Sequence, residues 1–213
     1  MESDAPVERE LKFSLVDPPP APADLVALGR GGPYAFVEAS AALHVDTYYD
    51  DDAGSLRRAG VALRRRRRAG AAEAIATVKT AGRVDGAWHQ REELEAPMRG
   101  GDWPVPVARR LAEHVALWQL RPRLELEVER SAYRVTHAGR PVATLAFDRV
   151  SARLPGSERS AHFDEAEIEA VGDVDFGVLR GVAELVEGLV RLTPSPATKL
   201  ERAAAVLELG AVL

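Results

Sequence analysis

The sequence contains no cysteine and no long apolar run, and each absence excludes a class of protein. Without cysteine there are no disulfides, no thiolate chemistry and no cysteine-based zinc site. No apolar stretch approaches the roughly 20 residues that a membrane-spanning helix needs. The first residues also lack the basic and apolar regions of a signal peptide. We therefore expect a cytoplasmic protein with no membrane partner.

Aromatic residues are scarce, at 6%, and the net charge is −5. A nucleic-acid-binding domain is typically basic, whereas this chain has 28 basic and 33 acidic residues. Residues 64–68 form an unbroken run of arginine, but the run holds no aromatic side chain on which a base could stack. We expect no nucleic-acid partner, and the run favours a local binding site for a small anion.

The length of 213 residues suits one domain, and a hydrophobic content of 46% is enough for a core. The chain shows neither internal repeats nor a stretch with the composition of a linker. We therefore expect a single domain over residues 1–213, with residues 1–5 disordered.

Eight segments show the alternation of period two, or the β-rich composition, that is typical of strands. They are residues 7–13, 34–49, 61–68, 74–80, 89–95, 123–128, 142–150 and 161–171. Residues 22–28, 52–59, 105–117, 176–192 and 198–209 are predicted to be helices, the fourth with Asp175 as its N-cap. The pattern predicts a mainly β fold with flanking helices (α+β), built on an antiparallel sheet or barrel.

Charged side chains recur on one face of several predicted strands. On a single strand this pattern is typical of a face turned to solvent. Here both signs occur and are largely segregated, with glutamate on the first and last strands and arginine and lysine on the middle ones. If the sheet closes, such faces line a tunnel. The positions are Glu8, Glu10 and Lys12; Arg64, Arg66 and Arg68; Thr77 and Lys79; Arg91, Glu93 and Glu95; and Glu165, Glu167 and Glu169.

A tunnel lined with both signs of charge predicts one kind of ligand. Arginine and lysine bind phosphate oxygens, arginine in a bidentate manner. Paired glutamates bind a hard divalent cation such as Mg²⁺ or Mn²⁺, which also bridges to phosphates. A polyphosphate that carries a metal ion satisfies both sets, and without such a ligand the two sets would pair with each other.

Nine short motifs resemble, in order along the chain, those of the CYTH superfamily, also called triphosphate tunnel metalloenzymes. Class IV adenylate cyclases and thiamine triphosphatases belong to it. The opening pattern Glu-x-Glu-x-Lys, present at residues 8–12, is weak by itself, but the full series runs from residue 7 to about residue 205. The other motifs are residues 46–50 (Asp-Thr-Tyr-Tyr-Asp), 63–66 (Leu-Arg-Arg-Arg), 78–79 (Val-Lys), 91–94 (Arg-Glu-Glu-Leu), 130–133 (Arg-Ser-Ala-Tyr), 147–148 (Phe-Asp), 167–169 (Glu-Ile-Glu) and 198–200 (Thr-Lys-Leu).

The resemblance implies an eight-stranded antiparallel β-barrel that forms a charged triphosphate tunnel. It implies that Mg²⁺ or Mn²⁺ is held by Glu8, Glu10, Glu167 and Glu169. It implies further that Lys12, Glu93 and Asp148 act in catalysis, Asp148 by helping to bind metal or to orient water. The substrate-binding residues would be Lys12, Arg64, Arg66, Lys79, Arg130 and Lys199.

In the predicted strand, Arg130 falls on the same face as the apolar residues Leu124, Leu126 and Val128, whereas a phosphate ligand should lie on the charged face. We predict a β-bulge near Glu129 that turns Arg130 inward. The glutamates at positions 125, 127 and 129 are then expected on the outer face of the sheet.

The expected activity is metal-dependent hydrolysis of a triphosphate to a diphosphate and phosphate. Animal thiamine triphosphatases carry a Trp two residues before the first tunnel arginine, where this chain has Ala62. Without that platform an organic base loses stacking worth about 1–3 kcal/mol, so inorganic triphosphate is favoured as the substrate. Two alternatives stay open. One is a class IV-type adenylate cyclase, which converts ATP to cyclic AMP and pyrophosphate, and the other is a non-catalytic polyphosphate-binding module.

The end of the chain carries a second resemblance. Residues 195–203 are similar to the closing segment of CYTH domains that precede a helical CHAD domain. A CHAD domain in cis would indicate inorganic or long-chain polyphosphate as the substrate class. The sequence leaves open whether the chain is part of a longer protein, and whether it is a monomer or a homodimer.

Overall fold

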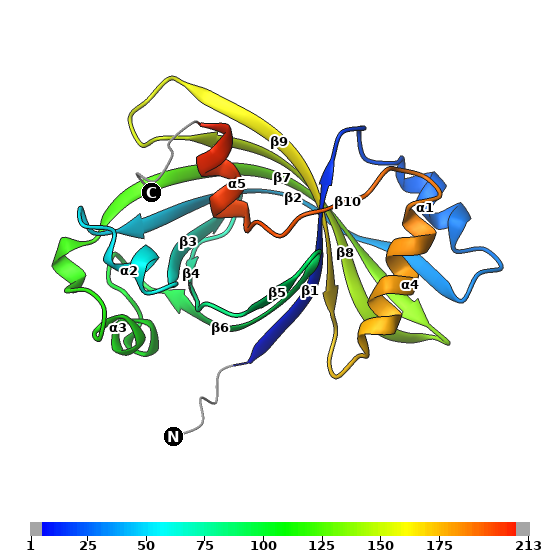
Figure 1. Cartoon of the computed structure of the whole chain (residues 1–213), viewed down its shortest axis with the longest axis horizontal. Helices are drawn as coiled ribbons and strands as arrows, with labels where there is room; N and C mark the ends of the chain where they lie inside the picture. Colours follow the sequence, from blue (N-terminus) through cyan, green and yellow to red (C-terminus); the bar gives the residue numbers. More distant parts are fainter. Residues whose placement is uncertain (1–5, 208–213) are drawn as a thin grey trace.

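The computed structural model describes residues 6–207, so the disorder expected for residues 1–5 lies outside the described part of the chain. Its main feature is a closed barrel of antiparallel strands, as the resemblance implied (Figure 1). The eight barrel strands are β1 (Val7–Leu15), β2 (Tyr34–Asp50), β3 (Ala62–Arg68), β4 (Ala74–Lys79), β6 (Trp88–Met98), β7 (Arg121–His137), β8 (Arg140–Arg153) and β9 (Ser160–Ala170). Their order around the barrel is β1, β9, β8, β7, β2, β3, β4 and β6, and β6 closes it by pairing with β1.

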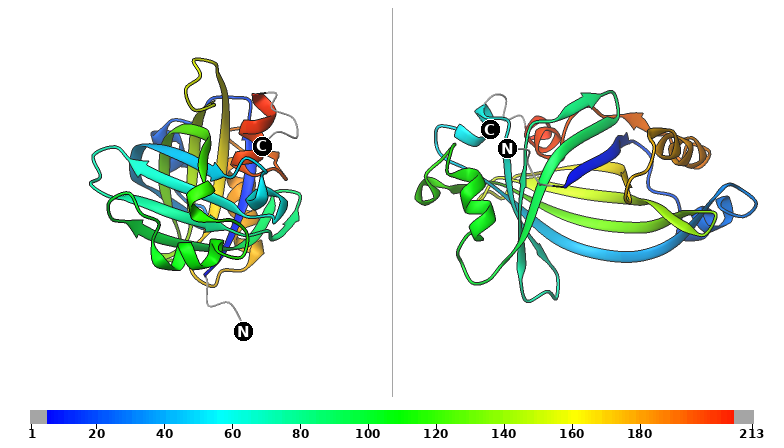
Figure 2. Two further views of the ribbon diagram at one scale, coloured as in Figure 1. Left: turned by 90° about the vertical axis from the view of Figure 1, so that its left-hand side faces the viewer. Right: turned by 90° about the horizontal axis from the view of Figure 1, so that it is seen from below.

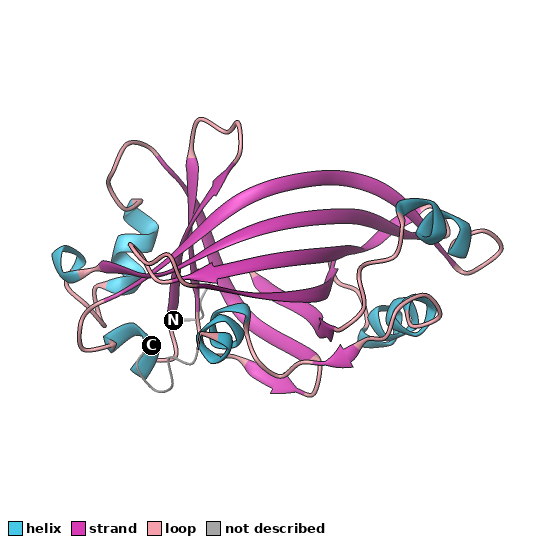
Figure 3. Ribbon diagram, turned by 90° about the horizontal axis from the view of Figure 1, so that it is seen from above, coloured by secondary structure: helices cyan, strands magenta, loops and turns pink. Residues whose placement is uncertain are grey.

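All eight strands expected from the alternation are present, and most extend further than predicted. The longest are β2 and β7, with 17 residues each, which pair with each other along almost their whole length. Figure 3 shows that long curved strands form the body of the molecule and that helices lie at both of its ends. Two short strands were not predicted: β5 (Arg83–Asp85) pairs with β6, and β10 (Thr193–Pro194) pairs with β1. Two or three residues are too few to show a period in the sequence.

Helices occur in all five predicted places, and the second, third and fourth are shorter than expected. The end of the fifth expected helix, residues 208–209, lies outside the described part of the chain. They are α1 (Pro22–Leu28), α2 (Ser55–Arg58), α3 (Val105–Leu111), α4 (Phe176–Val186) and α5 (Lys199–Val206), with a 3₁₀ turn, η1 (Leu117–Gln119). Asp175 caps α4 by accepting a hydrogen bond from the Gly177 amide at 2.6 Å, as predicted. α4 ends just before Gly188, and Val190 and Leu192 then enter the same core without helical structure. In the described residues, no helix combines the length and apolar character required to traverse a bilayer.

The two faces of β1 show why the barrel forms. Leu11 and Phe13 lie on one face and pack with Ile168 of β9 and Leu179 of α4 in a buried apolar cluster. Burial of each such side chain contributes roughly 1.5–3 kcal/mol to the free energy of folding. The opposite face carries Glu8, Glu10 and Lys12, which therefore point into the barrel. The helices gather at the two ends of the molecule, with α1 and α4 at one end and α2 and α3 at the other (Figures 1 and 2).

The helix α5 covers part of the inward face of the barrel. Its residue Ala203 and its C-cap residue Leu207 pack with Leu124 and Leu126 of β7. A capping box at Thr198 starts the helix: Thr198 Oγ1 accepts from the Glu201 amide at 3.2 Å, and Glu201 accepts from the Thr198 amide at 2.7 Å. This cap makes Lys199 the first helical residue and places it at the charged interior.

Candidate active site

The inward faces of the strands surround a cavity of about 230 Å³ whose lining is mostly charged. Of the twelve residues predicted to form the site, all but Glu10 and Asp148 line this cavity. Those two are buried in its wall, with 2% and 0% of their surface exposed. The barrel therefore assembles residues from β1, β3, β4, β6, β7, β8, β9 and α5 around one volume.

Glu8 and Glu10 of β1, two predicted metal ligands, are paired with basic side chains. Lys79 donates to both oxygens of Glu8, at 2.8 and 2.9 Å. Arg91 donates from Nε to Glu8 at 2.9 Å and from Nη2 to Glu10 at 3.1 Å. Burial opposes ionisation of Glu8, but the charges of Lys79 and Arg91 outweigh it and hold its pKa well below the usual range. Arg91 is absent from the predicted site, although its alternation with Glu93 was a signal that it faces inward.

Lys12 of β1 lies between two carboxylates. Its ammonium is 3.1 Å from Glu10 and also donates a hydrogen bond to Glu167. Lys12 and Glu167 are direct cross-strand neighbours in the pairing of β1 with β9, which joins opposite ends of the sequence. Burial would lower the pKa of Lys12, but the charges of Glu10, Glu167 and Glu165 raise that pKa well above the usual range. The ammonium is therefore charged at any physiological pH.

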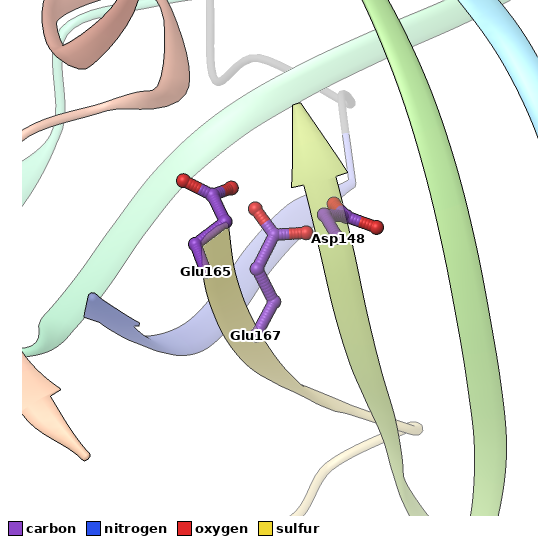
Figure 4. Close-up of side chains that lie close together, drawn as sticks. All are labelled: Asp148, Glu165 and Glu167. Carbon is purple, nitrogen blue, oxygen red and sulfur yellow. The ribbon is translucent and has the colours of Figure 1, made fainter. Parts of the chain in front are cut away.

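Three acidic side chains on β8 and β9 form a compact cluster. Asp148, Glu165 and Glu167 offer carboxylate oxygens within 4.8 Å of one another (Figure 4). The Nζ atom of Lys199 lies at this cluster, 2.5 Å from Asp148, 2.8 Å from Glu165 and 3.5 Å from Glu167. An ammonium thus already balances part of the charge there. Glu165 is missing from the predicted metal ligands, although its alternation with Glu167 placed it on the same face.

Glu169 is the predicted metal ligand that makes no direct contact with a basic side chain among residues 6–207. Within residues 6–207, no ion pair joins it to a basic residue, and its cross-strand neighbour is Glu10. Glu169 is exposed, but desolvation of its carboxylate and the charges of Glu8, Glu10 and Glu167 raise its pKa to about 7, while the charge of Lys79 opposes the shift. A divalent cation at this point would relieve the crowding, and carboxylate oxygens are the donors that Mg²⁺ and Mn²⁺ prefer. The residues present therefore fit such an ion.

Arg64 and Arg66 of β3 share one buried aspartate on β2. Arg66 donates to both oxygens of Asp46, from Nε and from Nη2, at 2.7 Å each. Arg64 donates to Asp46 Oδ2 at 3.5 Å and to Thr77 Oγ1 at 3.1 Å. Burial would raise the pKa of Asp46, but Arg64 and Arg66 outweigh it and hold that pKa well below the usual range. Asp46 belongs to a motif noted in the sequence but not to the predicted site.

Arg130 of β7 faces the cavity without the predicted bulge. The pairing of β7 with β8 is uninterrupted from Glu125 to Val135, and the nearest irregularity in β2 lies between Glu38 and Ser40. The bulge near Glu129 was therefore wrong. The apolar residues at 124, 126 and 128 also face inward, because α5 packs against them. The expectation that the glutamates at 125, 127 and 129 face outward is confirmed by the same alternation.

Glu93 of β6 differs from most carboxylates in the tunnel. Burial raises its pKa to about 7, and the charge of Glu8 acts in the same direction, whereas Lys79, 3.2 Å away, opposes the shift. A group with a pKa near neutrality can exchange a proton at physiological pH. The position thus meets one requirement for the catalytic part predicted for it.

A second, larger cavity of about 760 Å³ adjoins the tunnel near α2 and α5. Tyr48, Ala62, Lys79 and Arg91 line both cavities. Ala62, where thiamine triphosphatases are expected to carry a Trp, therefore stands at the boundary between them. A ligand bound in the tunnel could extend into this space.

The chain belongs to the CYTH domain family, whose model matches residues 8–204. A search of curated proteins gives no match to the sequence. The fold is shared with solved structures of low sequence identity, so the likeness concerns architecture. The metal dependence expected of this family agrees with the acidic residues found in the tunnel.

Three solved structures illustrate the likeness. One is an adenylyl cyclase candidate from Hippeastrum, for which a dominant triphosphatase activity is described. It is 18% identical in sequence, the alignment covers 93% of this chain and 95% of that chain, and the TM-score is 0.61. A candidate adenylate cyclase from Bacillus halodurans is 18% identical, and the alignment covers 91% of this chain and 95% of that chain with a TM-score of 0.59. The protein PH1819 from Pyrococcus horikoshii OT3 is 20% identical, covering 95% and 99%, with a TM-score of 0.56.

Proposed function

We propose that this protein is a divalent-metal-dependent triphosphatase that hydrolyses inorganic triphosphate to pyrophosphate and phosphate. The observation that carries the proposal is the lining of the 230 Å³ cavity, where basic and acidic side chains alternate around one small volume. A ligand that brings both negative oxygens and a cation satisfies both sets at once. The described triphosphatase activity of the Hippeastrum protein, which shares the fold, supports the same class of reaction.

The metal ion would be held by Glu8, Glu10, Glu167 and Glu169. When bound, Mg²⁺ or Mn²⁺ supplies charge neutralisation at phosphate oxygens. Glu169 supports this assignment because desolvation and the charges of Glu8, Glu10 and Glu167 raise its pKa to about 7, against the opposing charge of Lys79.

The chain's own residues supply positioning and charge, which are the main requirements of phosphoryl transfer. Arg64, Arg66, Lys79, Arg130 and Lys199 would bind the oxygens and hold the triphosphate in line. Glu93, with its pKa of about 7, would accept a proton from the attacking water near neutral pH. Lys12 would stabilise the charge that develops on the leaving pyrophosphate.

The test is phosphate release from inorganic triphosphate, ATP and thiamine triphosphate, measured side by side with Mg²⁺, Mn²⁺ or EDTA. We expect inorganic triphosphate to be hydrolysed fastest, and only with metal. Glu10→Gln should remove activity while the circular dichroism spectrum is unchanged. Glu129→Gln is the matched control, because Glu129 lies on the outer face, 3.7 Å from Arg149. Full turnover in EDTA by dialysed protein would overturn the proposal.

A nucleotide reaction is the second candidate, and the 760 Å³ cavity is the observation that favours it. A nucleoside attached to a triphosphate in the tunnel would have room there, beside Tyr48 and Ala62. Incubation with ATP and metal separates the outcomes. Cyclic AMP with pyrophosphate would indicate a cyclase, ADP with phosphate would indicate a triphosphatase of broad specificity, and tight binding with no turnover would indicate a polyphosphate-binding module.

A further inference from the structure

Two aspartates are buried in the tunnel wall without lining the cavity. Asp46 on β2 and Asp148 on β8 each have 0% of their surface exposed. Neither is among the described residues that line the 230 Å³ cavity, whereas Glu8, Glu93, Glu167 and Glu169 are. The carboxylates of the tunnel thus differ in access: some line the cavity, whereas Asp46 and Asp148, like Glu10 and Glu165, do not.

Each buried aspartate holds the guanidinium of one arginine from the side away from the cavity. Asp46 accepts from Nε and Nη2 of Arg66 at 2.7 Å each. Asp148 accepts from Nε and Nη2 of Arg130 at 2.7 and 2.6 Å. Each also contacts a second cavity-lining cation, Arg64 at 3.5 Å from Asp46 and Lys199 at 2.5 Å from Asp148.

This geometry determines which donors remain for a phosphate. A guanidinium has five N–H groups in a plane, and a carboxylate that takes the Nε edge leaves the opposite edge free to point away from it. Because Arg66 lines the cavity and Asp46 does not, the free edge of Arg66 points toward the cavity. Arg130 also lines the cavity, but its Nη2 donates to Glu167 as well as to Asp148, so fewer of its donors are free. A bidentate pair also holds the side chain in one rotamer, so less freedom is lost when a phosphate binds.

We propose that Asp46 is a positioning residue, which orients Arg66 and Arg64 toward the phosphates, and that Asp148 has the same relation to Arg130 and Lys199. This inference rests on the proposed function, because it assumes that the tunnel binds a triphosphate. It gives Asp46 a role that the sequence motif did not define. For Asp148 it adds the orientation of Arg130 and Lys199 to the role that the resemblance implied.

The experiment is a double-mutant cycle on the affinity for inorganic triphosphate, measured by calorimetry in the presence of EDTA so that no hydrolysis intervenes. The variants are Asp46→Asn, Arg66→Met and the double variant, with Glu129→Gln as the control. Asp46→Asn should bind triphosphate about tenfold more weakly, a size expected for residues in direct contact. In the Arg66→Met background, Asp46→Asn should weaken triphosphate binding by a clearly smaller factor, because the residue that Asp46 orients is gone.

Two results would overturn the inference. If Asp46→Asn binds triphosphate as tightly as wild type or more tightly, Asp46 does not position the arginines. If it weakens binding equally in both backgrounds, its effect does not act through Arg66. If Asp46→Asn alone is unstable, Asp46→Glu takes its place, because it keeps the buried charge but lengthens the side chain; binding of triphosphate as tight as in wild type would then overturn the inference.

A second readout separates this inference from the proposed function. In ¹⁵N-edited NMR spectra, the Nε–H of Arg66 should exchange slowly in wild type and rapidly in Asp46→Asn. Wild-type protein that shows this difference but binds no triphosphate would contradict the proposed function and leave the orientation of Arg66 by Asp46 intact. Equal exchange in both proteins would contradict the inference, whatever the tunnel binds.

Discussion

Lys79 Nζ lies 2.8 Å from Glu8 Oε1, so a predicted phosphate ligand and a predicted metal ligand neutralise each other across the tunnel. Arg130 and Glu167 form the same kind of pair, with Nη2 2.5 Å from Oε2. A metal ion must displace a basic side chain from each carboxylate, and a phosphate must displace a carboxylate from each basic side chain. Either ligand, by breaking these pairs, leaves the other set unpaired and ready to bind.

Metal and triphosphate should therefore bind with positive cooperativity. We expect each to raise the affinity for the other by a factor within about 5–150, the range of typical coupling energies of 1–3 kcal/mol. Calorimetry with Mg²⁺ and a non-hydrolysable imidotriphosphate, corrected for their complex in solution, measures this factor. In Lys79→Met the coupling should shrink, because one competing pair is gone. Independent binding in wild type would contradict the exchange of partners inferred here.

Metal binding should depend on pH through Glu169. Its pKa is raised to about 7, so the group is protonated at pH 6 and must lose a proton when a cation binds. Affinity for Mg²⁺ should fall as the pH drops from 8 to 6, and binding at pH 6 should release protons, measured by calorimetry in buffers of different ionisation enthalpy. Glu169→Gln should remove most of this dependence, and Glu129→Gln should not. Proton release that is unchanged in Glu169→Gln would assign the titration to another group.

Glu169 should also make the stability of the folded protein depend on pH. The folded pKa of about 7 lies above the ordinary glutamate value of 4.5, so the folded state binds more protons between these values. Its contribution to stability is fully present below pH 4.5 and is lost as the pH rises through 7. Glu169→Gln should therefore raise the thermal midpoint relative to wild type at pH 8 and change it little at pH 4. An equal change at both pH values would contradict the raised pKa.

The arginines of residues 64–68 should differ in their effect on triphosphate binding according to the face of β3 on which they lie. Arg64 and Arg66 line the cavity, whereas Arg65 lies on the outer face, its guanidinium 5.7 Å from the ring centre of Tyr49. Charge-assisted hydrogen bonds are worth roughly 1.5–3 kcal/mol, so Arg64→Ala or Arg66→Ala should weaken triphosphate binding by that amount. Arg65→Ala should bind almost as wild type does. Folding must be checked by circular dichroism, since Arg66→Ala leaves Asp46 with a weaker partner. Equal losses from all three would contradict the alternation.

Lys12 should act mainly in the transition state. Its ammonium is already in contact with Glu10 and Glu167, so a ground-state contact to phosphate adds little, whereas charge on the leaving group strengthens the interaction. We expect Lys12→Met to lower kcat far more than it raises KM. Hydrolysis in ¹⁸O-labelled water should place the label in orthophosphate, which marks attack at the terminal phosphorus. Label found only in pyrophosphate, or a change confined to KM, would contradict the role assigned to Lys12.

The faces of the strands could be predicted from the sequence, because alternation of side chains is a local property of an extended chain. The charged faces of β1, β3, β6 and β9 follow from this alternation, and the amphipathic pattern of α4 follows from helical periodicity in the same way. For the same reason the glutamates at 125, 127 and 129 could be placed outside. The closed barrel itself was inferred from the motif series, since alternation is equally compatible with an open sheet.

Only the tertiary structure shows how deeply each side chain is buried and which residues it contacts. Alternation places Asp46, Arg64 and Glu8 alike on the inward side, but it does not show that Asp46 lies behind the cavity wall. That difference depends on how strands from distant parts of the chain are staggered around the barrel. The inward apolar face of β7 has the same origin: it exists because α5, about 75 residues further on, packs against it. A bulge was therefore predicted where none was needed, because sequence alternation carries no information about a distant helix.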